Sequence, residues 1–356
     1  MQSLQRAEHF TDYDAFYAGL ERSEASDGLP MLPPTRERVE ACLAAAGLQA
    51  GDILGEVPTR EGVLDAERVA ANAVMAGCLP EYMPVVAAAV RAWCHPKANP
   101  HGTTATLSGS AHAVIVNGPI RAELGINCGA GCFGPGTRAN AAIGRSIRLA
   151  MRNICHARPG FSDRATYALP ARYSFCFGED EDHTRWSPLH VERGWDARAN
   201  VATVHGFVDQ YDLRDDTSTG PEQLLDRLSS LARSRPIHVD NFVAEDRSVL
   251  IVFGPRHRAI LEAAGWTKAD VRSYLHPRLT APHTFGTGLE RHVQGSAPTG
   301  NTGEFDFYLP RAENIHVVAA GGAGEPLTAV IYPHQCTTVS AEITTDGSAG
   351  RIQPNL

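Results

Sequence analysis

The chain has 356 residues, of which 43% are hydrophobic and 20% are charged. It is long enough to bury a large core, either as one unit or as two packed halves. The formal net charge of −8 argues against nucleic acid as a partner, because nonspecific binding to phosphates needs a basic surface.

We also expect no membrane partner, because no hydrophobic stretch approaches the roughly 20 residues that span a bilayer. The first residues lack the apolar core of a secretory signal. Eight cysteines spread along the chain indicate reduced thiols rather than a disulfide framework. These features together predict a cytoplasmic protein.

Residues 1–34 predict an acidic, partly helical arm that ends in the extended segment GLPMLPP. A first α/β half is expected over residues 35–160. It begins with helices predicted over 36–46, over 64–76, and from Pro80 or Pro84 to about Trp93. A short strand over 113–116, an Asn-Gly-Pro turn, a glycine-rich loop and a helix over 137–153 follow.

Residues 161–220 have little periodicity, so we expect an irregular but ordered connecting excursion there. The second α/β half, residues 221–343, repeats the order strand, Gly-Pro turn and helix, and residues 344–356 are expected to be a flexible tail. The segments VIVNGP and LIVFGP each begin a unit of strand, turn and helix, which indicates two similar halves. The predicted class is α/β, with mixed sheet or sheets flanked by helices and ligands at the carboxyl ends of strands.

The glycine-rich segment NCGAGCFGPGTRANAAIGRSIRLAMRN, residues 127–153, predicts an anion site. Glycines let the backbone approach a ligand, and the first turn of the following helix offers free amides and a positive dipole end. Arginines recur every seven residues along one helix stripe at Arg138, Arg145 and Arg152, with Arg148 close by. The alternative is a plain connector followed by a solvated helix face. The predicted anion-binding residues are Gly134, Gly136, Thr137, Arg138 and Arg145.

Three cysteines are candidate thiolates. Cys128 and Cys132 have the spacing C-x3-C, which is not the redox C-x-x-C, yet a helix start nearby would lower a thiol pKa. Cys336 follows His334 by two residues, where a buried strand cysteine is the alternative. His257 follows a strand-end turn and is the leading candidate base, although it also suits an exposed helix N-terminus.

The 15 histidines make a metal site conceivable, and a transition metal is the one cofactor that the sequence leaves open. The candidate ligands are His95 and His101 in CHPKANPHG, together with His334 and Cys336 in YPHQC. Histidine and cysteine are suitable ligands, but neither spacing is a tetrahedral zinc signature. The alternative for His95 and His101 is that they cap a helix and stabilise a loop.

Several long sequence segments resemble those of a largely uncharacterised bacterial family related to the UGSC-type selenocysteine or cysteine proteins. The resemblance covers roughly residues 28–335 and lies in GLPMLPPTRERVEA, NAVMAGCLPEYMPVV, VNGP, GPGTRANAAIGR and GPRHRAILEAAGWTKADVRSYL. The Cys/Sec-Gly-Ser-Cys element that names the UGSC group is missing. The resemblance implies that Asn140 joins Gly134, Gly136, Arg138 and Arg145 in a shared site or a shared packing motif.

These observations favour an enzyme that acts on a small anionic molecule by cysteine-dependent chemistry. The reaction would be thiol redox, or formation or cleavage of a carbon–heteroatom bond. One alternative is a His/Cys metal-dependent lyase or hydrolase. Another is a non-catalytic binding protein for an anionic metabolite. Several apolar helices make a homo-oligomer plausible.

Overall fold

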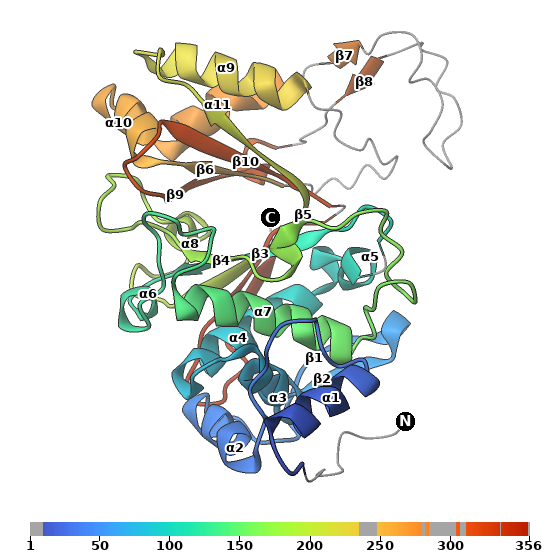
Figure 1. Cartoon of the computed structure of the whole chain (residues 1–356). Helices are drawn as coiled ribbons and strands as arrows, with labels where there is room; N and C mark the ends of the chain where they lie inside the picture. The colour runs from blue at the N-terminus through green and yellow to red at the C-terminus, as the bar shows by residue number, and fades with distance from the viewer. Residues whose placement is uncertain are drawn as a thin grey trace.

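A computed structural model describes residues 10–104, 106–234, 248–279, 282–284, 304–306, 311–334 and 336–354. Its centre is an eight-stranded mixed sheet, and two small two-stranded sheets accompany it. Helices cover the sheet above and below in the view of Figure 1. The α/β class and the mixed sheet are therefore confirmed.

Six of the eight strands of the central sheet form two similar three-stranded units, and β11 and β12 extend the sheet beside β5. In each unit, two parallel strands are followed by an antiparallel third strand, and the two third strands pair with each other. The first unit is β4 (Cys176–Gly178), β3 (Ala111–Asn117) and β5 (Val201–Arg214); the second is β9 (Ile315–Ala319), β6 (Val249–Phe253) and β10 (Leu327–Pro333). The predicted similarity of VIVNGP and LIVFGP corresponds to β3 and β6, each of which runs into a Gly-Pro turn.

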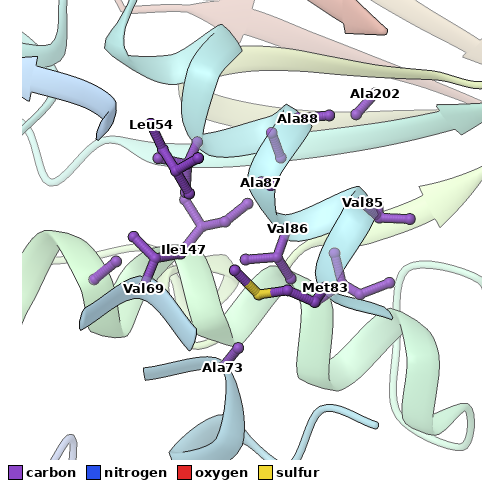
Figure 2. Packing of buried hydrophobic residues seen from close by; sticks show 14 of the residues in the cluster. Leu54, Val69, Ala73, Met83, Val85, Val86, Ala87, Ala88, Ile147 and Ala202 are labelled. Atoms are coloured by element: carbon purple, nitrogen blue, oxygen red, sulfur yellow. The ribbon is translucent and has the colours of Figure 1, made fainter. Parts of the chain in front are cut away.

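Helices predicted in the first half are present with nearly the expected bounds. They are α2 (Arg36–Ala45), α3 (Ala66–Ala76), α4 (Met83–Cys94) and α7 (Arg138–Asn153). The helix α4 is apolar except for Arg91, and its residues from Met83 to Trp93 are buried, because α3, α7 and the sheet pack around it. Figure 2 shows Met83 and Val86 of α4 beside Ala73 of α3. An arm helix, α1 (Tyr13–Arg22), and the hairpin of β1 (Ile53–Val57) and β2 (Gly62–Asp65) complete this part.

The second unit carries its own helices and its own apolar core. They are α9 (Pro221–Ser234), α10 (Pro255–Ala263) and α11 (Lys268–Leu279). A separate cluster joins residues of both units, among them Ile115, Phe177, Val252 and Val318. Its β3 and β6 residues alternate along the strands with residues of the other cores, so this cluster lies on one face of the sheet.

The remaining described elements are short. They are α5 (Pro100–Thr104), α6 (Ile120–Glu123), α8 (Leu189–Glu192), β7 (Pro282–Thr284), β8 (Glu304–Asp306), β11 (Val339–Glu342), β12 (Ile352–Pro354) and the 3-10 turns η1 (Pro58–Arg60), η2 (Pro80–Tyr82), η3 (Pro96–Ala98), η4 (Pro170–Arg172) and η5 (Ala312–Asn314). Among the described residues, no helix is both long and apolar enough to cross a membrane.

Two segments are more regular than their sequences suggest. The 14-residue strand β5 lies within the expected irregular excursion, 161–220, and is the strand on which the two units meet. Its first seven residues are buried, so the polar alternation of a half-exposed strand is missing. At the C-terminus, β12 pairs with β11 in the segment expected to be a flexible tail.

Candidate functional site

The carboxyl ends of β3, β4 and β9 meet at one edge of the sheet. The amide of Asp180, just after β4, donates to the Ala319 carbonyl at 2.7 Å, and the Gly321 amide donates to the Cys128 carbonyl at 2.8 Å. These bonds bring the cysteine loop, residues 127–136, to the ends of strands from both halves. Strand ends of this kind are the usual place for ligands in α/β folds.

A buried polar network lies at the end of β3. The side-chain amide of Asn117 donates to Glu179 Oε2 at 2.7 Å and to Glu181 Oε1 at 2.9 Å. The other oxygen of Glu179 accepts from Lys268 Nζ at 2.7 Å, and both of these charged side chains are 1% exposed. Within the described residues, the buried Oδ1 of Asn117 has no hydrogen-bond partner. The network therefore holds a buried acceptor without a hydrogen bond.

Arg121 connects this edge to the cysteine loop. Its Nη1 lies 3.6 Å from Cys128 Sγ, and its Nη2 donates to Asp182 at 2.7 Å. The side chain of Arg121 is 7% exposed, and its Nε has no partner among the described residues. The guanidinium of Arg121 therefore contacts both the thiol of Cys128 and the carboxylate of Asp182.

Cys128 is half-buried. Burial raises the pKa of its thiol, Arg121 lowers it, and the carboxylates of Asp180 and Asp182 raise it; the net direction is upward. The resting group is thus a thiol, and Arg121 is the cation that stabilises its thiolate.

Asn140 on α7 fixes the cysteine loop. Its Oδ1 accepts from the Asn127 amide at 2.8 Å, and its Nδ2 donates to the carbonyls of Asn127 at 3.0 Å and Cys132 at 3.3 Å. Gly131 has a φ of 69°, which suits glycine within this loop. The resemblance implied a shared site or a packing motif for Asn140, and its contacts are those of a positioning residue.

The arginines of α7 have protein partners. Arg145 forms a two-point ion pair with Asp27 at 2.8 Å and also donates to the carbonyls of Leu29 and Pro30. Arg138 donates through Nε to the Gly77 carbonyl at 2.9 Å. Arg145 thus holds the N-terminal arm rather than pointing with Arg138 at one ligand beside the loop.

The predicted glycine turn lies at the start of α7. Thr137 is the N-cap residue as predicted, although its side chain makes no capping bond, and Gly134 and Gly136 are exposed. The first amides of α7 therefore have no side-chain cap. Anion binding there stays a prediction.

The other two candidate thiols are buried. Burial raises the pKa of Cys132 to about 12, although nearby backbone amides oppose the shift. Cys336 is 2% exposed, and its Sγ donates to the Gly206 carbonyl at 3.1 Å. Every cysteine is a free thiol. Of the three candidates, Cys128 is therefore the accessible one.

His257 is a buried member of the second half rather than an exposed helix end. Its Nδ1 lies 2.7 Å from Thr328 Oγ1, and its Nε2 lies 2.8 Å from the Asp215 carbonyl. Burial lowers its pKa. With both ring nitrogens occupied, His257 has no free atom with which to act as a base on Cys128.

The His257→Ala variant is expected to lose about 1–3 kcal/mol of stability, because Thr328 and the Asp215 carbonyl lose their buried partner. The rate of Cys128 alkylation should stay within about twofold of that of the parent chain. Urea unfolding together with iodoacetamide labelling measures both quantities. A variant of full stability in which Cys128 labels slowly would show that His257 acts as a base.

The proposed metal ligands do not assemble. His95 caps η3 by accepting from the Lys97 amide at 3.2 Å, and His101 is exposed. His334 Nε2 lies 3.2 Å from the Gly102 carbonyl. In the part of the chain that the structure describes, no three His, Cys, Asp or Glu side chains are grouped to hold a metal ion.

Gly178, the last residue of β4, gives Arg121 its space. A Cβ there would lie 2.7 Å from Arg121 Cδ and 3.4 Å from Cys128 Cβ. We expect Gly178→Ala to displace Arg121, to slow alkylation of Cys128 severalfold, and to cost about 1–3 kcal/mol through overpacking.

Gly129→Ala is the matched control for Gly178→Ala. Its added Cβ meets only Asn127 Oδ1, at an ordinary 3.6 Å. Labelling kinetics followed by peptide mass spectrometry compare the two variants. Equal Cys128 rates in both would contradict the role given to Arg121.

Arg121, Asn117, Glu179 and Lys268 are residues that sequence reasoning missed. The available signals were the arginine that follows VNGP and the acidic run EDED, residues 179–182, which directly follows β4. In comparisons with known proteins, no family model, no curated protein and no solved structure matches the chain.

Proposed function

We propose that the protein is an enzyme that uses the Cys128 thiolate to form or cleave a carbon–heteroatom bond in a small molecule. One observation carries the proposal. A half-buried thiol lies 3.6 Å from the Arg121 guanidinium, at an edge where strand ends of both halves meet. Nucleophilic cysteines typically have a cation nearby and partial exposure to solvent.

Two atoms without hydrogen-bond partners indicate which polar groups the substrate would carry. Arg121 Nε is a buried donor, and Asn117 Oδ1 is a buried acceptor; neither has a partner within the described residues. A substrate with an anionic or acceptor group for Arg121 and a donor for Asn117 would satisfy both. We expect a negative group of the substrate to contact Arg121. The carboxylates of Asp180 and Asp182, which raise the pKa of Cys128, would repel such a group elsewhere near the thiol.

In the chemical step, the Cys128 thiol loses its proton to solvent, and the sulfur electron pair attacks an electrophilic carbon. A carbon–sulfur bond forms, and the carbon–heteroatom bond breaks with its electron pair leaving on the heteroatom. Arg121 stabilises the thiolate, and Asp182 orients Arg121. Disulfide chemistry with Cys132 is less well supported, because burial raises the pKa of that thiol to about 12.

The test is a comparison of Cys128→Ser with Cys336→Ser. Each variant is incubated with a small-molecule fraction of a bacterial extract, and consumed or produced compounds are followed by mass spectrometry. Conversion that is lost in Cys128→Ser and kept in Cys336→Ser is the expected result. Conversion that survives in Cys128→Ser would overturn the proposal. Saturable binding without conversion would favour the binding-protein alternative.

A further inference from the structure

A second group of polar side chains lies at the opposite end of β3 from Asn117. His112 is five residues before Asn117 on this strand, which corresponds to about 16 Å. This separation is too long for one small molecule to contact both groups. The polar groups around His112 therefore do not belong to the Cys128 site.

His112 is buried without the hydrogen bonds that a buried imidazole needs. The residue is 5% exposed, and neither ring nitrogen has a partner among the described residues. Its ring makes a T-shaped contact with Trp93, with centroids 6.2 Å apart and an angle of 83° between the rings. Burial, followed by nearby Arg148 and Arg172, lowers its pKa well below the usual value. The neutral imidazole thus offers one N–H donor.

Two arginines lie close to this imidazole. Arg172 donates through Nε to the Ser110 carbonyl at 2.9 Å and pairs with Asp163 at 2.6 Å, but its Nη2 is buried without a partner in the described part of the chain. Ser110 is two residues before His112. The hydrogen bond to Ser110 therefore places Arg172 near His112 in space.

Arg148, on α7, is the second arginine that is close enough to lower the pKa of His112. Among the described residues, Arg148 makes one hydrogen bond, from its Nη1 to Met151 Sδ at 3.2 Å. Burial, followed by repulsion from Arg172, lowers the pKa of Arg148 to about 9. Asp163 pairs with Arg172 and also raises the pKa of Arg148, so the described residues place one carboxylate against two guanidinium groups.

We propose that Arg148, Arg172 and His112 form a binding site for a small oxyanion, such as a phosphate or carboxylate group. The anion would accept from Arg172 Nη2, from Arg148 and from the His112 N–H, and it would neutralise the excess charge. Its binding would link α7, the start of β3 and the segment that carries Asp163 and Arg172. This site lies outside the proposed active site and does not depend on the proposed reaction.

The test is calorimetric titration of the full chain with inorganic phosphate and, separately, with acetate, at an ionic strength fixed with sodium chloride. Saturable one-to-one binding of at least one anion is expected, and the stronger of the two identifies tetrahedral or planar recognition. Arg148→Gln should weaken that binding at least tenfold. Arg152→Gln, which removes the same charge one turn further along α7, should change it by less than twofold.

If Arg148→Gln does not fold, the imidazole resonances of His112 provide the second measurement. They should shift in the parent chain as the anion saturates the site. The proposal is overturned if neither anion binds saturably, or if binding leaves the His112 resonances unchanged. Equal weakening in Arg148→Gln and Arg152→Gln would also overturn it, because net charge alone would then explain the effect.

Discussion

Replacing Lys268 with Met is expected to destabilise the protein by about 3–5 kcal/mol, because the change leaves a charged partner buried without its counterion. Lys268 Nζ lies 2.7 Å from Glu179 Oε1, and both side chains are 1% exposed. Glu179 also accepts from Asn117 and from the Leu189 amide. The loss should therefore loosen the end of β3 as well as the ion pair.

Chemical unfolding of Lys268→Met and of the double variant Lys268→Met/Glu179→Gln measures this effect. The double variant should recover part of the stability, because it no longer buries an unpaired carboxylate. Arg214→Met is the control, since its pair with Glu325 is 64% and 57% exposed and should contribute less than about 1 kcal/mol. A loss below about 1 kcal/mol in Lys268→Met would contradict the buried network.

Replacing Arg121 with Met is expected to slow alkylation of Cys128 at pH 8 by about tenfold, because the pKa of the thiol rises when the guanidinium is removed. Arg121 lowers the pKa of Cys128, whereas burial, Asp180 and Asp182 raise it. Without the guanidinium, the pKa rises further above the assay pH. The thiolate fraction at that pH falls in proportion.

The pH dependence of the labelling rate separates this electrostatic effect from a change in access. In Arg121→Met, the curve should move to higher pH while its plateau stays within about twofold. Arg185→Met removes an exposed positive charge from the segment that carries Asp182 and is the control. A lowered plateau with an unshifted midpoint would mean that Arg121 controls only the packing around the thiol.

Helices with strong apolar periodicity or clear end signals were predictable from the sequence. The helix predicted over 137–153 begins at Arg138 after its N-cap Thr137, and the helix predicted over 36–46 ends at Ala45. The strand β5 was not predicted, because its first half is buried on both faces and its sequence includes His205 and Gly206. Such a strand lacks the alternation that identifies half-exposed strands.

The candidate site was only partly predictable for a different reason. The sequence indicated Cys128 and its loop, but it could not choose among Cys128, Cys132 and Cys336, because burial depends on tertiary packing. The importance of Arg121 depends on Asp182, which lies 61 residues away in the chain. His257 has a typical helix-start sequence context. Its ring nitrogens nevertheless contact Thr328 and Asp215, which come from distant parts of the chain.

Native-state alkylation of all eight cysteines, resolved by peptide mass spectrometry, tests the central claim most directly. Cys128 is expected to label first, since it is half-buried and lies beside Arg121. Cys94, which is also partly exposed, should follow slowly because burial raises its pKa well above the usual value. Cys132 and Cys336 should stay protected until the chain unfolds. An unlabelled Cys128 beside a fast-reacting Cys132 or Cys336 would contradict the assignment of Cys128 as the reacting group.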